Sequence, residues 1–309
     1  TKTKPLYKFL QLLTNISDNR LTISNVDYFV RSIFRKYNEP YSFAKDSTDT
    51  REHFDHYTPN MCLEIFDKYP KEKYDLILVD EAQDFYKDWY EALCFAKKDD
   101  GQIVFFYDPF QEQHENSMIK DLEKSEDVTK FALRTNFRNT SVITNLLSKL
   151  IKSYFPENQL TFSKPQVGHS KIPEFIEISD RNNQIYKIAE IVENLTYKEK
   201  ISPKNIAIIY DGSIKAPSRK DPSITTELKK RGLSVVSAEE YSESYTENSL
   251  TLDTIKRFKG LEKTVIILTN LKIIDKNTVK DLYTGLSRAR AHLIIISNKN
   301  IIKNIKEIL

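Results

Sequence analysis

Short uninterrupted runs of apolar residues, separated by amphipathic segments, recur along the chain. Five runs have the length and β-branched content of strands buried in a parallel sheet: residues 76–79, 103–106, 206–209, 265–268 and 293–296. Helical periodicity occupies the intervals, at residues 142–151 after the cap pair Asn139-Thr140, at 185–195, and at 225–231 before Gly232. This alternation predicts an α/β fold with parallel sheets.

The 309 residues are enough for two domains. The polar stretch from Glu123 to Thr129 is the predicted boundary, which gives a first domain at 1–127 and a second at 128–309. The segments Asp46–His56 and Gly212–Asp221 are rich in polar residues and are predicted to be surface loops.

The charge and composition exclude several classes of protein. With 47 basic and 44 acidic residues, the net charge of +3 rules out a histone-like binder but leaves room for a local basic groove. No apolar run reaches the ~20 residues of a transmembrane helix, and residues 1–10 lack a secretion signal. The two cysteines, Cys62 and Cys94, form no disulfide framework. We therefore expect a cytoplasmic protein with no membrane partner.

Two adjacent acids carry the strongest chemical signal. The apolar run 76–79 ends in Asp80 and Glu81, which places both carboxylates at the carboxyl edge of the sheet, where α/β folds bind ligands. One carboxylate can hold Mg²⁺ through water, and its neighbour can accept the proton of a water that attacks phosphate. The alternative is that the two acids only begin a helix, where they favour the macrodipole.

The segment Asp80–Asp84 resembles the magnesium-binding motif of UvrD/Rep-like superfamily 1 DNA helicases. Four further motifs follow in the order of that family, at Tyr107–Gln111, Leu133–Asn139, Thr254–Glu262 and Leu282–Arg290. The resemblance implies two RecA-like parallel-sheet domains of the P-loop NTPase type, the first of them incomplete at its N-terminus. It also implies ATP and Mg²⁺ as cofactors.

The resemblance implies a role for individual residues. Asp80 would hold Mg²⁺ through water, Glu81 would be the catalytic base, and Gln111 would sense the γ-phosphate. Arg138 and Arg288 would supply cations from the second domain, which suits phosphoryl transfer because guanidinium matches phosphate oxygens. The nucleotide-binding residues would be Gln83, Phe137, Gly260 and Glu262, with Phe137 stacking on adenine and Glu262 near the ribose and phosphates. Surface salt bridges are the alternative for the arginines, and core packing is the alternative for Phe137.

Nucleic-acid contacts are predicted in two places. Lys256, Arg257 and Lys259 form a basic string that suits a phosphate backbone, although a solvated charged face would look the same. His114 stands where the family has a tyrosine, and Asn116 stands where the family has a base-stacking tryptophan. The stacking platform is therefore expected to be weakened or moved.

The chain also lacks a motif that these helicases have. Their glycine-rich loop ends in Gly-Lys-Thr/Ser and cradles the phosphates, whereas the first glycine here is Gly101. Residues 1–10 resemble the segment that follows this loop, and Leu21–Phe29 fit the next strand and turn. We therefore expect the loop on an upstream segment of the same polypeptide or on a partner chain. The 309 residues alone are expected to be an inactive ATPase with exposed apolar surface and a tendency to self-associate.

Other catalytic or metal-binding groupings are weak. His53 and His56 have a His-x-x-His spacing but no third ligand at metal-site spacing.

Two hypotheses follow from the sequence. In the first, the chain is the C-terminal part of an ATP-dependent helicase or translocase that moves on single-stranded or partly duplex DNA. In the second, it is a binding or regulatory module, controlled by nucleic acid or by a partner, with little or no unwinding activity.

Overall fold

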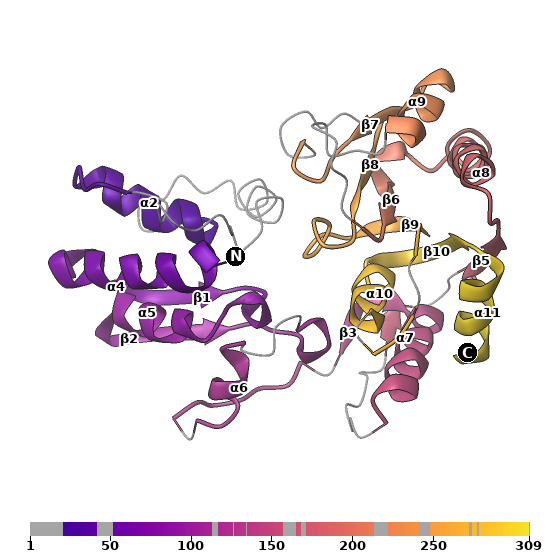
Figure 1. The fold of residues 1–309 in the computed structure, drawn as a ribbon. Helices are drawn as coiled ribbons and strands as arrows, with labels where there is room; N and C mark the ends of the chain where they lie inside the picture. Colours follow the sequence, from indigo (N-terminus) through magenta and orange to yellow (C-terminus); the bar gives the residue numbers. More distant parts are fainter. Residues whose placement is uncertain are drawn as a thin grey trace. The chain divides into compact units, whose positions relative to one another are not determined.

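The computed structural model describes residues 21–41, 52–112, 117–125, 127–133, 135–156, 165–167, 171–212, 222–240, 248–271, 274–276 and 278–308. The chain divides into two compact units, Thr1–Lys130 (unit 1) and Phe131–Leu309 (unit 2) (Figure 1). Each unit is an α/β structure with parallel strands.

Unit 1 is built on a pair of parallel strands. Its main elements are α2 (Val26–Lys36), α4 (Thr58–Lys68), β1 (Tyr74–Val79), α5 (Asp88–Ala96), β2 (Lys97–Phe105) and the short α6 (Ile119–Leu122). Short helical turns lie at His53–Tyr57, Pro70–Glu72, Ala82–Asp84 and Pro109–Gln111. In the β1–β2 pair, Leu78 lies opposite Val104 and Val79 opposite Phe105.

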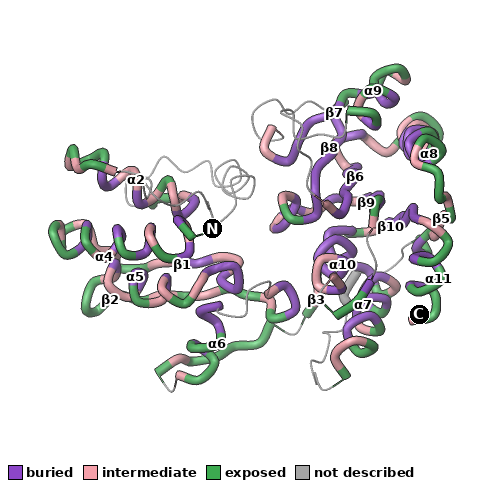
Figure 2. Tube along the Cα trace, in the orientation of Figure 1, coloured by how far each residue is buried: buried purple, intermediate pink, exposed green. Residues whose placement is uncertain are grey.

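The two faces of the β1–β2 sheet differ in burial. One face packs on α2, α4 and α5 through Val79 and the half-buried Ile77 and Phe105. On the other face, Leu76 and Leu78 are 51% and 58% exposed. Along β1 and β2, exposed residues are interspersed with partly buried ones, and only the last residue of β1, Val79, is buried (Figure 2). The side chains of Leu76, Leu78, Val104 and Phe106 are all exposed to solvent. We call these four residues the apolar face of unit 1.

Unit 2 contains a six-stranded parallel sheet. Its strands are β5 (Glu174–Glu177), β6 (Ile206–Tyr210), β7 (Ser234–Val236), β8 (Ser249–Thr254), β9 (Lys263–Thr269) and β10 (Ala289–Ser297), in the spatial order β5-β10-β9-β6-β8-β7. A separate parallel pair joins β3 (Asn136–Thr140) to β4 (Pro165–Val167). The helices are α7 (Ser141–Tyr154), α8 (Arg181–Glu193), α9 (Pro222–Lys230), α10 (Val279–Leu286) and α11 (Lys299–Ile308), with short turns at Asn194–Lys198 and Pro203–Asn205.

Helices cover both faces of the large sheet (Figure 1). On one face, α8 and α9 pack against alternate residues such as Ile208 and Ile267. On the other face, Gly285 of α10 lies so close to Leu268 that a Cβ there would approach it to 3.2 Å. All five residues of β6 are consequently buried.

Most elements predicted from the sequence are present. The five apolar runs lie in strands, except that Phe106 follows the last residue of β2. The strands pair in parallel, and α7, α8 and α9 occupy the predicted helical intervals. Among the described residues, no helix has both the length and the apolar character needed to span a bilayer.

Two local predictions are wrong. The strand expected within Leu21–Phe29 is absent, because Val26 already begins α2 and the Oδ1 atom of Asn25 caps this helix by accepting from the Tyr28 amide at 2.8 Å. The loop expected up to His56 is partly helical, because His53–Tyr57 forms a wide helical turn that leads into α4. Residues 1–20, 42–51 and 213–221, on which the other N-terminal and loop predictions fall, lie outside the described part of the chain.

Candidate functional site

The acidic motif of unit 1 lies directly after β1. Asp80 Oδ1 accepts a hydrogen bond from the Glu81 amide at 2.9 Å. Glu81 has φ 54° and ψ 44°, a left-handed conformation that costs a residue other than glycine roughly 1–2 kcal/mol. The chain then turns through the short helix Ala82–Asp84. In this conformation the Glu81 carboxylate accepts a hydrogen bond from the Gln83 side chain.

Amide side chains connect this motif to the one that follows β2. Gln83 Nε2 donates to Glu81 Oε2 at 2.5 Å, and Gln83 Oε1 accepts from the Asp108 amide at 3.2 Å. Gln111 Nε2 donates to Asp108 Oδ2 at 2.7 Å. Gln83 is fully buried and Gln111 is 5% exposed, so burial holds both amides in place. Asp108 was not among the predicted site residues, although an acid two positions after the second apolar run was a usable signal.

The donor chemistry at this edge of the sheet suits magnesium. Mg²⁺ is usually held by one or two carboxylates together with water and the phosphates of a substrate. Within the described ranges, no three His, Cys, Asp or Glu residues are grouped to hold a metal ion by themselves. A single carboxylate such as Asp80 therefore fits a metal bound mainly through water and phosphate oxygens.

In unit 2, two asparagines connect two motifs that are distant in sequence. Asn136 Oδ1 accepts from the amides of Arg138 and Asn139 at 2.9 and 3.0 Å. Asn139 Nδ2 donates to the carbonyls of Ser287 and Ala289, which are 148 and 150 residues away. These bonds fix the start of α7 against the start of β10.

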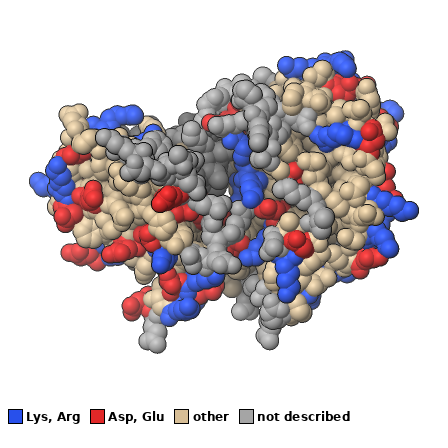
Figure 3. All heavy atoms as spheres, in the orientation of Figure 1, with Lys and Arg blue, Asp and Glu red and all other residues tan. Residues whose placement is uncertain are grey.

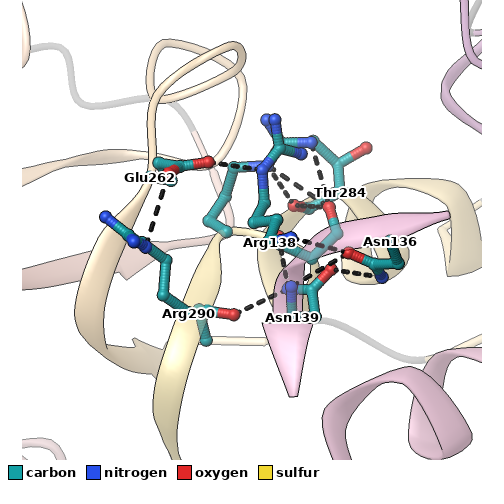
Figure 4. A network of polar contacts seen from close by, with 9 residues as sticks. Asn136, Arg138, Asn139, Glu262, Thr284 and Arg290 are labelled. Carbon is teal, nitrogen blue, oxygen red and sulfur yellow. Dashed lines mark hydrogen bonds and ion pairs between the residues drawn. The ribbon is translucent and has the colours of Figure 1, made fainter. Parts of the chain in front are cut away.

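Two arginines flank one glutamate beside these asparagines (Figure 4). Arg138 Nε lies 2.5 Å from Glu262 Oε2, and Arg290 Nε lies 3.5 Å from Glu262 Oε1. The three side chains are partly exposed, at 40% for Arg138, 57% for Arg290 and 33% for Glu262. We call these three residues the basic cluster. Arg290 was not among the predicted site residues.

Phe137 and Gly260 lie on the segments that carry this cluster. Phe137 is 69% exposed, which excludes the core-packing interpretation and leaves the ring accessible. Gly260 has φ 82°, and a glycine adopts this conformation readily in the turn that leads to Glu262.

Arg288 has different surroundings from Arg138. It is 1% exposed, and its guanidinium donates to the Thr284 carbonyl at 3.0 Å and to Ser287 Oγ at 3.0 Å. In this structure Arg288 therefore contacts the end of α10, whereas Arg138 is open to solvent. The predicted contact of Arg288 with phosphate stays a prediction.

The basic string predicted to bind nucleic acid is mostly engaged within unit 2. Arg257 pairs with Asp253 and Glu239, each at 3.0 Å, and Lys259 is 2% exposed. Burial raises the pKa of Asp253, while the Arg257 guanidinium opposes this shift. Lys256 keeps 63% of its side chain exposed and lies 3.7 Å from Asp281. Of these three cations, Lys256 is thus the most accessible to a polyanion, since Arg257 is 28% exposed.

The remaining predictions of contact residues have mixed outcomes. His114 lies outside the described residues. His53 and His56 contact different partners, because Nε2 of His53 lies 3.3 Å from the Tyr41 hydroxyl and Nδ1 of His56 lies 2.8 Å from Asp88.

On the face drawn in Figure 3, basic and acidic side chains are intermixed, as the nearly balanced charge leads one to expect.

Comparison with known proteins gives similarity to solved structures but none to curated sequences or family models. No family model matches the sequence, and no curated protein matches it. Among solved structures, the C-terminal domain of a possible DNA helicase from Lactobacillus plantarum WCFS1 is similar, with 17% identity and a TM-score of 0.39. The similarity covers 53% of this chain and 88% of that one. It is too weak to assign this chain to a family.

Proposed function

We propose that this chain forms most of the core of an ATP-driven motor that acts on single-stranded or partly duplex DNA, of the UvrD/Rep-like type. Its two units would be RecA-like domains that bind ATP and Mg²⁺. The phosphate-cradling loop would come from an upstream segment of the same polypeptide or from a partner chain.

One observation carries the proposal: the five motifs read from the sequence form two polar clusters. In unit 1, the Gln83 and Asp108 contacts join the acidic motif to the motif that ends in Gln111. In unit 2, Arg138 meets Glu262 across 124 residues of sequence. One cluster is rich in carboxylates and the other in guanidinium groups, the two chemistries that phosphoryl transfer requires.

The residues present fit the steps of ATP hydrolysis. Asp80 would hold Mg²⁺ through water, and the metal would neutralise charge on the β- and γ-phosphates. Glu81, oriented by Gln83, would accept the proton of the attacking water. Arg138 would counter the negative charge that develops in the transition state, and Phe137 would stack on the base.

The nucleotide contact can be tested on the chain itself. Saturation-transfer NMR with ATP reports which protons of a weakly bound ligand touch the protein. We expect transfer to the adenine protons in the wild type, a loss of most of it in Phe137→Leu, and no change in Phe131→Leu. Phe131 is the matched control, since it is an aromatic residue with 87% exposure. Absent transfer in the wild type, or equal losses in both variants, would contradict the proposal.

Hydrolysis of ATP can be tested in a protein that also contains the phosphate-cradling loop. In a polypeptide or complex that contains a Gly-Lys-Thr/Ser loop, Glu81→Gln should lower the turnover of ATP about 10²–10⁴-fold while nucleotide binding is retained. Glu91→Gln, on the exposed side of α5, is the control of equal charge change. Turnover of Glu81→Gln within a few-fold of wild type would remove Glu81 from the role of base.

One observation favours the second hypothesis, a binding or regulatory module. Arg288 is buried against α10 and Arg257 is held by two acids, so two of the predicted cations are already engaged in unit 2. Such a module would bind oligo(dT) without DNA-stimulated phosphate release. Fluorescence anisotropy at several salt concentrations, run beside the hydrolysis assay, separates the two functions.

A further inference from the structure

The basic cluster has more hydrogen-bonding capacity than its internal contacts use. Arg138 and Arg290 both approach Glu262 through their Nε atoms. Within the described residues, the terminal nitrogens of these two arginines make no hydrogen bond. A guanidinium offers five N–H donors, and its terminal pair is the part that binds phosphate oxygens bidentately.

The spacing of the two arginines is fixed by the backbone around them. Arg138 lies on β3, where its amide donates to Asn136 Oδ1. Arg290 follows Ala289, whose carbonyl accepts from Asn139 Nδ2 at 2.6 Å. One asparagine thus ties both arginine-bearing strands together, so the pair is preorganised before any ligand binds.

Glu262 occupies the position between the two cations. It carries one negative charge against two positive charges, so the cluster keeps a net charge of +1. The carboxylate is 33% exposed and precedes the first residue of β9, Lys263. Exposed ion pairs of this kind are worth little, about 0–1 kcal/mol, because water competes with them. An incoming polyanion can therefore displace Glu262 at small cost.

We propose that Arg138 and Arg290 form a binding site for the polyphosphate chain of a nucleotide, and that Glu262 is an internal competitor for that site. This inference rests on the proposed function and adds a residue, Arg290, that the sequence motifs did not assign. It also reverses the expected effect of a Glu262 substitution on ligand affinity. If Glu262 only contacted the ribose, its loss would weaken ligand binding, whereas loss of a competitor strengthens it.

Inorganic tripolyphosphate is the probe, because it has no ribose and no base. Calorimetric titration of the full chain should show about tenfold tighter binding for Glu262→Gln than for wild type, since one competing charge is removed. Arg290→Gln should bind at least about tenfold more weakly. The control is Glu193→Gln, which makes the same charge change at the Arg231–Glu193 pair, whose atoms lie 2.5 Å apart. Its affinity should stay within about twofold of wild type.

Several outcomes overturn the inference. Weaker or unchanged tripolyphosphate binding in Glu262→Gln would exclude the competitor role, as would equal gains in Glu262→Gln and Glu193→Gln. Absence of binding in both wild type and Glu262→Gln would exclude the site. Circular dichroism of each variant verifies that the fold is retained.

The inference and the proposed function fail separately. If tripolyphosphate behaves as expected but the adenine protons of ATP show no contact with Phe137, the anion site stands and the nucleotide motor does not. If ATP contacts Phe137 but Glu262→Gln weakens tripolyphosphate binding, the motor stands and the competitor is excluded.

Discussion

Strands β1 and β6 are both uninterrupted apolar runs that pair in parallel, yet their surroundings differ. All five residues of β6 are buried between two layers of helices. In β1, Leu76 and Leu78 are more than half exposed, because the helices of unit 1 pack on the other face of the strand. An apolar run therefore predicts that a strand forms, whereas the helices packed around it decide how many of its faces are covered.

We expect the largest difference in the free energy of unfolding between alanine substitutions within β6 and β1. Ile208→Ala in β6 removes a fully buried side chain and should lower the free energy of unfolding of unit 2 by about 3–4 kcal/mol. Leu78→Ala in β1 should cost unit 1 less than about 1 kcal/mol, because the leucine is 58% exposed. Hydrogen exchange with mass spectrometry reads the two units separately. Similar losses at both positions would show that the apolar face of unit 1 is covered in solution.

The same contrast of burial extends to charged side chains within unit 2. Arg288→Ala should lower the free energy of unfolding by about 2–3 kcal/mol, because a buried charged donor to Thr284 and Ser287 is lost. Arg138→Ala should cost less than about 1 kcal/mol, since its ion pair is half exposed. Urea denaturation measures both. Equal stability of the two variants would mean that Arg288 leaves its buried position in solution.

Self-association tests the apolar face of unit 1. Exposed apolar patches of this kind promote association, so Leu78→Lys should weaken any concentration-dependent self-association about tenfold. Tyr186→Lys is the matched control, because Tyr186 is 54% exposed but lies on α8 of unit 2. Sedimentation velocity at several concentrations gives the comparison. An equal effect of both lysines would point to net charge as the cause.

The smallest effect concerns pH and the edge of the large sheet. His292 Nε2 lies 2.8 Å from Glu174 on β5, and Lys171 and Glu199 also act on it. Burial lowers the pKa of His292 below its usual 6.5, although Glu174 opposes this shift. Because the folded state then binds the proton less readily than the unfolded state, unit 2 should lose stability as the pH falls below about 6.5.

Thermal unfolding at several pH values checks the sign of this effect. His292→Gln should flatten the pH dependence in that window. A wild type that gains stability on acidification would show that the Glu174 pair outweighs burial.

The strands and helices with a clear period could be predicted because burial imposes that period on the sequence. β3 could not be predicted, since Asn136–Thr140 contains polar residues that are held by side-chain bonds rather than by an apolar run. Helix α2 was predictable in principle, because Val26, Val30 and Ile33 repeat on one face after the Asn25 cap.

The candidate site shows the same limit. The order of the motifs in the sequence indicated Glu81, Gln83, Gln111, Arg138 and Glu262. The sequence could not show that Asp108 joins two of them, that Arg288 is buried, or that Arg290 flanks Glu262. Asp108 and Arg290 contact residues of other motifs, which spacing does not encode. Arg288 bonds to its near neighbours Thr284 and Ser287, but the motif alone does not show that its side chain is buried.

The position of β10 in the sheet has a consequence for synthesis. β10 (Ala289–Ser297) lies between β5 (Glu174–Glu177) and β9 (Lys263–Thr269) in the sheet. After β5 has been translated, over a hundred further residues must be translated before β10 can pair with it. At ~5–20 residues per second, this delay lasts roughly 6–20 s. During that interval the edge of β5 is unpaired, the edge of β9 joins it once β9 has been translated, and Asn139 has neither of its carbonyl acceptors. The basic cluster can therefore form only after Arg290, at the start of β10, has been translated, and ribosome stalling before β10 would favour aggregation of the incomplete sheet.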